Sequence, residues 1–301
     1  MAKEINGKIP LIGFTGVGPM GGKMVRWLLQ AGYPVLVYDL DRERLEAKVK
    51  EGAQAAKSNV DVVERCDIVM TSLPLSEVWV KVAETEFVPN ARPGQIFIDM
   101  GTVAPPETRR LYEEFKKKDA HLIDSPVSNG GTGPDGRLFV FVAGDKEIVD
   151  KVWPIFEVLG VPQHTVYCGP SGNGQVVKGV NQLNIGLIQA AMLETIAFAV
   201  RSGVAPEVIL QAICEPEKPG SRGGGVFLQI CKKAVEGNAK EVVVKHGQLM
   251  HYIKEAHLKG FDLPLSEALF DFLKDSPNTI KDANRMSPSF WDELLTKERK
   301  K

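Results

Sequence analysis

The sequence has little of what marks secreted, zinc-binding or nucleic-acid-binding proteins. Its 301 residues include four cysteines, Cys66, Cys168, Cys214 and Cys231, which lie far apart and form no C-x-x-C pair. This spacing fits neither a disulfide framework nor a zinc cluster. The 37 basic and 38 acidic residues give a formal net charge of -1, so no overall basic field exists to recruit nucleic acid. The first residues contain no apolar segment typical of a secretory signal, and we expect a cytoplasmic protein.

Long uninterrupted apolar runs are also missing. The most apolar segment, residues 181–200, is interrupted by Asn181, Gln182, Asn184, Gln189 and Glu194. Such a segment predicts a buried core helix and not a membrane span. The hydrophobic fraction of 44% and the charged fraction of 25% are those of a soluble globular protein. The length predicts roughly two domains.

The first half of the chain alternates short apolar runs with amphipathic segments. The expected strands are Lys8–Phe14, Pro34–Asp39, Asp67–Thr71, Gln95–Asp99, Ala120–Asp124, Leu138–Ala143 and Gln163–Tyr167. The expected helices between them are Gly18–Ala31, Asp41–Glu51, Ser76–Ala83 and Pro105–Lys118. This alternation implies right-handed crossovers and a mostly parallel, doubly wound sheet.

The pattern changes after a turn-rich stretch at residues 169–174, beyond which it is nearly all helical. The expected helices there are residues 174–202, 206–213, 226–236, 240–259 and 264–274. The sequence therefore predicts an α/β protein. A Rossmann-type domain over residues 1–172 is followed by an all-α domain over residues 173–301.

A glycine-rich motif, Gly-Val-Gly-Pro-Met-Gly at residues 16–21, follows the first expected strand and opens the first expected helix. In this G-x-G-x-x-G context, Gly16 allows a tight turn and Gly18 lets the backbone approach a pyrophosphate. Gly21 permits close helix packing. The helix N-terminus offers free N–H groups and a positive dipole end to phosphates. The motif predicts a dinucleotide-binding site.

The choice of dinucleotide depends on the end of the second strand. Asp39 lies 18 residues beyond Gly21, close to the usual offset of the acid that binds the ribose hydroxyls. A carboxylate there repels a 2′-phosphate and favours NAD over NADP. Arg42 and Arg44 are the alternative partners for such a phosphate, although both fit solvated helix positions.

Several segments, taken in order, resemble the β-hydroxyacid dehydrogenase family, which includes 3-hydroxyisobutyrate dehydrogenase and the tartronate and succinic semialdehyde reductases. The segments are Ile12–Gly21, Leu73-Pro74, Asp99–Thr102, Asp124–Ser128 and Gly174–Asn181, and the resemblance covers nearly the whole chain. It implies cofactor binding by Gly16, Gly18, Pro19, Met20, Gly21, Asp39, Leu73, Pro74, Thr102 and Lys245. It also implies substrate binding by Ser128, Asn129, Gly130, Asn181 and Gln182, and a catalytic Lys178.

The chemistry of hydride transfer supports a lysine in that role. When a carbonyl is reduced, negative charge develops on its oxygen, and a nearby ammonium can stabilise that charge and donate the proton. Lys178 lies one turn into an apolar helix, where partial burial and neighbouring cations would lower its pKa. Ser128 lies in a glycine-rich turn, where a hydroxyl beside backbone N–H groups can bind a carboxylate.

The chain departs from the family pattern at Gly101, Asn129, Gln182 and His246, where the family commonly has serine, glycine, asparagine and aspartate. Glutamine keeps the donor and acceptor of asparagine but reaches one methylene further. Either the substrate is displaced or Asn181 assists. These departures predict a pocket adapted to an unusual, more polar substrate.

The expected function is an NAD-dependent oxidoreductase that interconverts a small 3- or 4-hydroxy acid and its semialdehyde or keto acid. We expect a homodimer or homotetramer that binds neither nucleic acid nor membranes. The alternatives are an imine reductase on the same fold, which Lys178 disfavours, and a non-catalytic NAD-binding module. No metal is expected, because His246, His251 and His257 are spaced by five and six residues and share no i, i+4 face.

Overall fold

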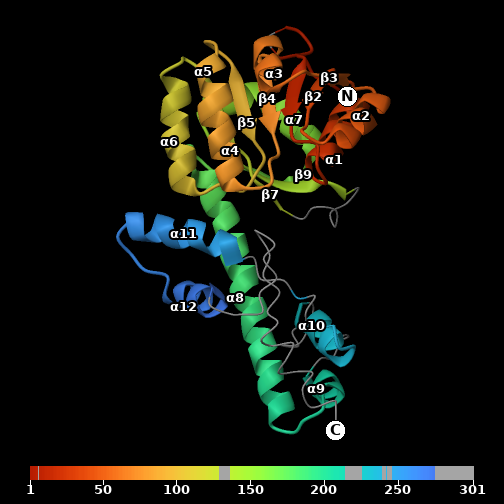
Figure 1. Cartoon of the computed structure of the whole chain (residues 1–301), viewed down its shortest axis with the longest axis vertical. Coiled ribbons are helices and arrows are strands. Elements are labelled where there is room, and N and C mark those ends of the chain that lie inside the picture. The colour runs from red at the N-terminus through yellow and green to blue at the C-terminus, as the bar shows by residue number, and fades with distance from the viewer. Residues whose placement is uncertain (6, 129–135, 214–225, 239–241, 243–245, 275–301) are drawn as a thin grey trace. The chain divides into compact units, whose positions relative to one another are not determined.

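The computed structural model describes residues 1–5, 7–128, 136–213, 226–238, 242 and 246–274. The chain divides into two compact units, residues 1–178 and residues 179–301 (Figure 1).

The first unit is built on a parallel six-stranded sheet with the order β3-β2-β1-β4-β5-β6. The strands are β1 (Ile12–Thr15), β2 (Val35–Tyr38), β3 (Gln54–Ala55), β4 (Ile68–Thr71), β5 (Ile96–Asp99) and β6 (His121–Asp124). This order confirms the predicted doubly wound sheet. It reverses between β1 and β4, the point where such sheets bind ligands. The pairing aligns the carboxyl ends of β1, β4, β5 and β6 along one edge.

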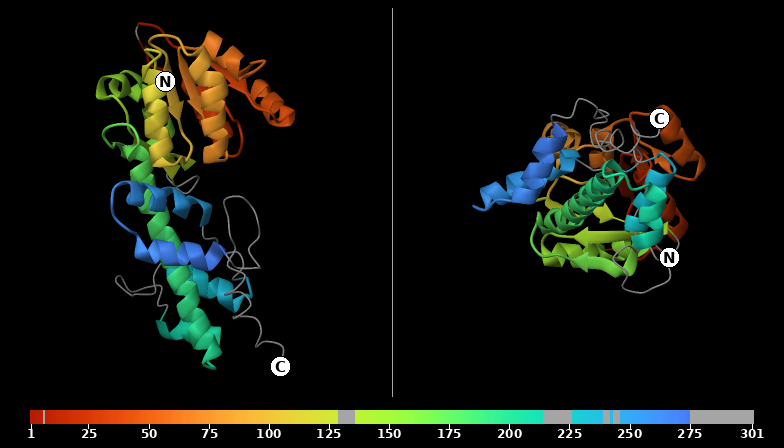
Figure 2. Two further views of the ribbon diagram at one scale, coloured as in Figure 1. Left: turned by 60° about the vertical axis from the view of Figure 1, so that its left-hand side comes forward. Right: turned by 90° about the horizontal axis from the view of Figure 1, so that it is seen from below.

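Helices cover both faces of this sheet (Figure 1 and Figure 2). They are α1 (Gly21–Ala31), α2 (Arg42–Lys50), α3 (Asn59–Arg65), α4 (Ser76–Val82), the π-helical turn η1 (Ala83–Phe87), α5 (Val88–Asn90), α6 (Pro105–Lys116) and α7 (Lys146–Leu159). Side chains of α1 and α7 share one hydrophobic core with the sheet, and those of α3, α4 and α6 share another. Successive strand residues point to opposite faces, so two cores require strands that are apolar throughout.

The structure corrects the prediction for the last strands of this unit. Two segments expected to extend the main sheet, now β8 (Leu138–Val142) and β9 (Gly160–Tyr167), instead form a separate three-stranded sheet with β7 (Val127–Ser128), which the sequence did not predict. β7 pairs antiparallel with β8, and an antiparallel bridge joins Asp124 to Ala143. The chain therefore folds back after β6, a step that apolar runs alone do not reveal because strand pairing is non-local.

The described part of the second unit is helical. Its elements are most of α8 (Asn173–Arg201), then α9 (Pro206–Ile213), α10 (Val226–Val235), α11 (His246–Leu258) and α12 (Pro264–Lys274). Their core includes Leu193 and Ile196 of α8, Ile253 of α11 and Leu273 of α12. Together the two units confirm the predicted fold class.

The helix α8 is long and apolar enough to cross a membrane when judged by length and composition alone, and 33% of its most apolar window is buried inside the chain. Core helices of soluble proteins meet the same criteria.

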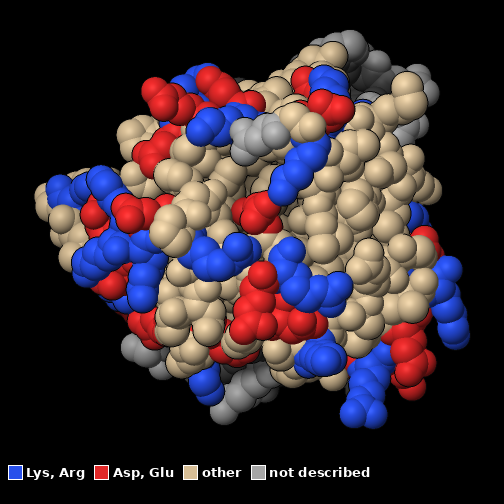
Figure 3. Space-filling model, turned by 90° about the horizontal axis from the view of Figure 1, so that it is seen from above, with Lys and Arg blue, Asp and Glu red and all other residues tan. Residues whose placement is uncertain are grey.

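On the face of the molecule in Figure 3, acidic and basic side chains are interspersed. Ion pairs such as Arg110–Glu84 join neighbouring elements of the first unit.

Candidate active site and cofactor-binding site

The glycine-rich loop connects the end of β1 to the start of α1. A Cβ atom on Gly16, whose φ is 89°, would lie 2.6 Å from the Ser72 carbonyl oxygen, and one on Gly21 would lie 1.9 Å from the Gly16 oxygen. The fold itself therefore requires glycine at both positions. A Cβ on Gly18 would approach only Arg44 Nη1, at 3.4 Å, among the described residues. A ligand that comes close to the backbone explains glycine at this position.

The surroundings of this loop fit a dinucleotide. The N-terminus of α1 has no side-chain cap at Met20 and no acidic residue in its first turn, so its positive end is free for phosphates. Pro19 is exposed, and Gly18 and Met20 are half-buried. In the described part of the chain, the buried hydroxyl of Thr15 at the end of β1 has no hydrogen-bond partner. A bound ligand would supply one.

Asp39, just beyond β2, is tied to the glycine loop. Its Oδ2 accepts a hydrogen bond from Val17 N at 2.7 Å, and its Oδ1 accepts one from Asp41 N at 2.8 Å. Each carboxylate oxygen retains a lone pair for a ribose hydroxyl. Arg44 Nε pairs with Asp41 Oδ2 at 3.0 Å. The structure thus places a carboxylate and a guanidinium beside the same loop.

The loops after β4 and β5 lie next to this one. The Leu73 carbonyl oxygen is 3.6 Å from the position of a Cβ on Gly101, which places the Leu73-Pro74 and Gly101-Thr102 segments side by side. Asp99 Oδ1 accepts hydrogen bonds from Thr71 Oγ1 at 2.9 Å and Gly101 N at 3.0 Å. Burial raises the pKa of Asp99 to about 7.

The first turn of α8 is seated on the end of β6. Asp124 Oδ1 accepts a hydrogen bond from Gly172 N at 2.7 Å, and Oδ2 accepts one from Gln175 N at 3.1 Å. Burial raises the pKa of Asp124 to about 6, although these hydrogen bonds oppose the shift. A Cβ on Gly174 would lie 2.4 Å from the Phe141 carbonyl oxygen, so the helix approaches the β8 backbone as closely as glycine permits.

The first three turns of α8 bury polar side chains and expose apolar ones. Gln175, Lys178 and Gln182, spaced at i, i+3 and i+7, share one helix face and are at most 6% exposed. Val176 is 36% exposed and Val180 is 66% exposed. This is the reverse of an ordinary amphipathic helix, in which the apolar stripe faces the core. The burial of Lys178 is unusual, because lysine side chains are seldom buried to this extent.

In the second unit, Gln182 is held by another glutamine. Its Nε2 donates to Oε1 of Gln248 on α11, and its Oε1 accepts a hydrogen bond from Asn181 Nδ2 at 3.3 Å. Both ends of the Gln182 amide are therefore engaged. Gln248 was not identified from the sequence, because it belongs to no motif and lies 66 residues from its partner.

The remaining predicted site residues are Ser128, Asn129, Gly130 and Lys245. Ser128 ends β7 and is half-buried. Asn129, Gly130 and Lys245 lie outside the described residues.

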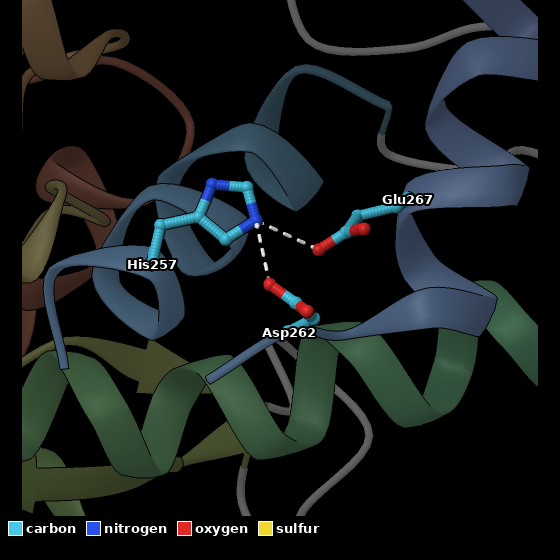
Figure 4. Close-up of side chains that lie close together, drawn as sticks. All are labelled: His257, Asp262 and Glu267. Atoms are coloured by element: carbon cyan, nitrogen blue, oxygen red, sulfur yellow. Dashed lines mark hydrogen bonds and ion pairs between the residues drawn. The ribbon is translucent and has the colours of Figure 1, made fainter. Parts of the chain in front are cut away.

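One histidine lies close to two carboxylates, between α11 and α12 (Figure 4). His257 Nε2 is 2.8 Å from Glu267 Oε1 and 3.7 Å from Asp262 Oδ1. Glu267 Oε1 also accepts a hydrogen bond from Leu263 N, which lowers the pKa of Glu267. His257 and Asp262 are exposed and Glu267 is half-buried. The contact between His257 and Glu267 closes the turn before α12.

Comparisons with known proteins agree with this arrangement. The family model for the NAD binding domain of 6-phosphogluconate dehydrogenase matches residues 11–169. The chain is 32% identical over 271 residues to the uncharacterized oxidoreductase YkwC of Bacillus subtilis, covering 87% of this chain and 92% of that protein. It is 32% identical over 222 residues to the NAD-dependent L-serine dehydrogenase of Pseudomonas aeruginosa, covering 73% and 72%.

Another relative is the 2-(hydroxymethyl)glutarate dehydrogenase of Eubacterium barkeri, 32% identical over 205 residues and 67% of each chain. Among solved structures, 3-hydroxyisobutyrate dehydrogenase from Salmonella typhimurium superposes with a TM-score of 0.73 at 20% identity. That match covers 95% of this chain and 98% of that one, and shows the shared fold. The chain is an oxidoreductase with an NAD(P)-binding domain and belongs to the β-hydroxyacid dehydrogenase family.

Proposed function

We propose that the protein interconverts a small 3-hydroxy acid and its semialdehyde, with NAD as the hydride acceptor and Lys178 as the general acid/base. The observation that carries this proposal is the burial of Lys178 on a polar face of α8, one turn beyond the residues seated on β6. Lysines are rarely buried to this extent, and buried ionisable groups cluster at functional sites, so the burial of Lys178 supports a chemical role.

The names of the relatives narrow the substrate class. L-serine, 2-(hydroxymethyl)glutarate and 3-hydroxyisobutyrate all have a CH2OH group on the carbon that bears a carboxylate. They differ only in the other substituent on that carbon, which is an ammonium, a carboxyethyl or a methyl group. We infer that this chain acts on the same core. The Gln182–Gln248 pair favours a polar substituent, because amide groups supply hydrogen bonds and no charge.

Each group then has one task. A bound nicotinamide would supply the hydride-accepting chemistry. The neutral amine of Lys178 removes the hydroxyl proton in oxidation, and its ammonium returns that proton to the carbonyl oxygen in reduction. Asn181, a half-buried residue whose Nδ2 donates to Gln182 Oε1, orients the reacting oxygen, since both ends of the Gln182 amide are engaged. Ser128, with Asn129 and Gly130, binds the substrate carboxylate.

We propose NAD as the preferred cofactor. Asp39 presents a carboxylate where the adenosine ribose is expected, and Arg44 is already paired with Asp41. A 2′-phosphate would meet the Asp39 charge and would have to compete for the guanidinium. We further propose a homo-oligomer, because Val180 and Phe198 of α8 are 66% and 72% exposed and a second copy would cover them.

The test is turnover by Lys178→Met on a panel of short hydroxy acids, read as NAD(P)H absorbance. The panel contains L-serine, 3-hydroxyisobutyrate, 2-(hydroxymethyl)glutarate, glycerate and 4-hydroxybutyrate, each with NAD and with NADP. We expect Lys178→Met to bind NADH normally and to lose roughly 100- to 10,000-fold in kcat, the usual contribution of a general acid/base.

The matched control is Lys48→Met, since Lys48 is also buried but its ammonium pairs with Glu51 and its side chain packs against Gly22 of α1. This control should keep wild-type kcat. Wild-type kcat in Lys178→Met would refute the mechanism. Activity on a cyclic imine and on none of the hydroxy acids would refute the substrate class.

A further inference from the structure

The side-chain amide of Gln175 holds the loop that follows β5. Its Oε1 accepts a hydrogen bond from Val103 N at 3.0 Å, and its Nε2 donates to the Gly101 carbonyl oxygen at 3.0 Å. These two backbone groups flank Thr102, the predicted cofactor contact. The amide therefore pairs with the loop on both sides of Thr102, much as a neighbouring strand would.

The backbone of Gln175 is fixed at the same time to the next strand. Its N–H donates to Asp124 Oδ2 at 3.1 Å, and Asp124 also holds Gly172 N at 2.7 Å. Gln175 is fully buried, as is Asp124. One residue thus joins the first turn of α8 to the ends of both β5 and β6.

Lys178 follows Gln175 by three residues on the same face of α8. Helical geometry transmits the position of Gln175 to Lys178, because the two are separated by less than one turn. A shift of about 1 Å between catalytic groups can cost roughly 100-fold in rate. The link between Gln175 and the Gly101–Val103 segment therefore bears on the chemistry and not only on stability.

We propose that Gln175 is a positioning residue that sets the placement of Lys178 relative to the cofactor-binding loop at Thr102. This inference rests on the proposed function, in which Lys178 moves the proton. In this role Gln175 contacts neither substrate nor cofactor. Gln175 acts through two side-chain hydrogen bonds to the Gly101–Val103 loop and one backbone hydrogen bond to Asp124.

The first test compares Gln175→Met with Gln95→Met. Gln95 is also buried, and its amide likewise bridges backbone groups, accepting from Arg92 N at 2.6 Å and donating to Val63 O at 2.7 Å. Gln95 immediately precedes β5, at the opposite end of that strand from Gly101. The two variants lose comparable hydrogen bonds, but only one loses them beside Lys178.

We expect Gln175→Met to lower kcat roughly 10- to 100-fold and to leave the Kd for NADH within about threefold, a difference under 1 kcal/mol. Gln95→Met should lower Tm by a similar amount and keep wild-type kcat. Equal kcat losses in the two variants, or wild-type kcat in Gln175→Met, would overturn the positioning role.

A second variant, Gln175→Glu, gives a readout that a purely structural role would not move. Ionised glutamate accepts from Val103 N but cannot donate to Gly101 O, whereas protonated glutamate can. The kcat of Gln175→Glu relative to wild type should therefore rise as pH falls, while the relative kcat of Gln175→Met stays flat. A flat ratio for Gln175→Glu would contradict the proposal.

Lys178→Met distinguishes a failure of the proposed function from a failure of the positioning role of Gln175. Wild-type kcat in Lys178→Met would overturn the proposed function and, with it, the role of Gln175. An inactive Lys178→Met beside a fully active Gln175→Met would overturn the positioning role alone.

Discussion

Gly18→Ala should separate cofactor binding from folding. The added methyl would contact only the end of the flexible Arg44 side chain, at 3.4 Å, among the described residues. Gly18 is not among the glycines with positive φ, so alanine fits its backbone without strain. We therefore expect the free energy of unfolding to change by less than about 1 kcal/mol, or about 2–4 °C in Tm.

Binding of NADH should respond differently, because the methyl occupies the space where the pyrophosphate approaches the backbone. We expect the Kd for NADH to rise at least about tenfold, which corresponds to about 1.4 kcal/mol. The assays are thermal denaturation of the free protein and a fluorescence titration with NADH.

Gly21→Ala is the matched comparison, since its Cβ would lie 1.9 Å from the Gly16 carbonyl oxygen. Relief of that overlap requires backbone movement and should cost about 3 kcal/mol or more. Two results would refute the reasoning: a wild-type Kd for NADH in Gly18→Ala, or a loss of Tm in Gly18→Ala as large as that in Gly21→Ala.

Three other predictions concern pH dependence and the substrate site. Burial raises the pKa of Asp99 to about 7, so the contribution of Asp99 to stability falls as pH rises from about 4 to 7. Asp99→Asn should remove that contribution, and its stability relative to wild type should gain about 1–3 kcal/mol across that range; a constant difference between the two proteins would contradict this. The hydrogen bond from Arg26 lowers the pKa of Glu51 to about 2, so Glu51→Gln should cost about 1 kcal/mol at pH 7 in urea denaturation. That cost should narrow as pH falls from about 4 towards 2, and a constant cost would exclude the ion pair as its source. In Gln182→Asn the asparagine side chain is too short to reach Gln248. This variant should raise the KM for the hydroxy acid more than about threefold and leave the Kd for NADH unchanged. An unchanged KM would show that the Gln182–Gln248 pair does not contribute to substrate binding.

The features predicted best from the sequence are those with local signals. The loop at residues 16–21 combines a glycine spacing with a preceding apolar run, and the structure places it between β1 and α1. Asp99 and Asp124 end apolar runs in the sequence and end β5 and β6 in the structure. Such signals need no knowledge of distant residues.

The features that were missed depend on distant partners. β8 and β9 have ordinary strand patterns, but their assignment to a second sheet depends on pairing across the chain. The helix α7 was not predicted; it contains Pro154, whose missing N–H weakens the helical pattern. The burial of Gln175 beneath exposed Val176 and Val180 reverses the usual rule for apolar side chains.

The two backbone hydrogen bonds of Asp39 constrain how cofactor preference can be engineered. A neutral or basic residue at this position would remove a carboxylate repulsion but would also release Val17 N, and with it the glycine loop. Redesign towards NADP should therefore keep Asp39 and begin at Asp41. A neutral residue at Asp41 would free the Arg44 guanidinium beside Gly18 and leave the loop anchored.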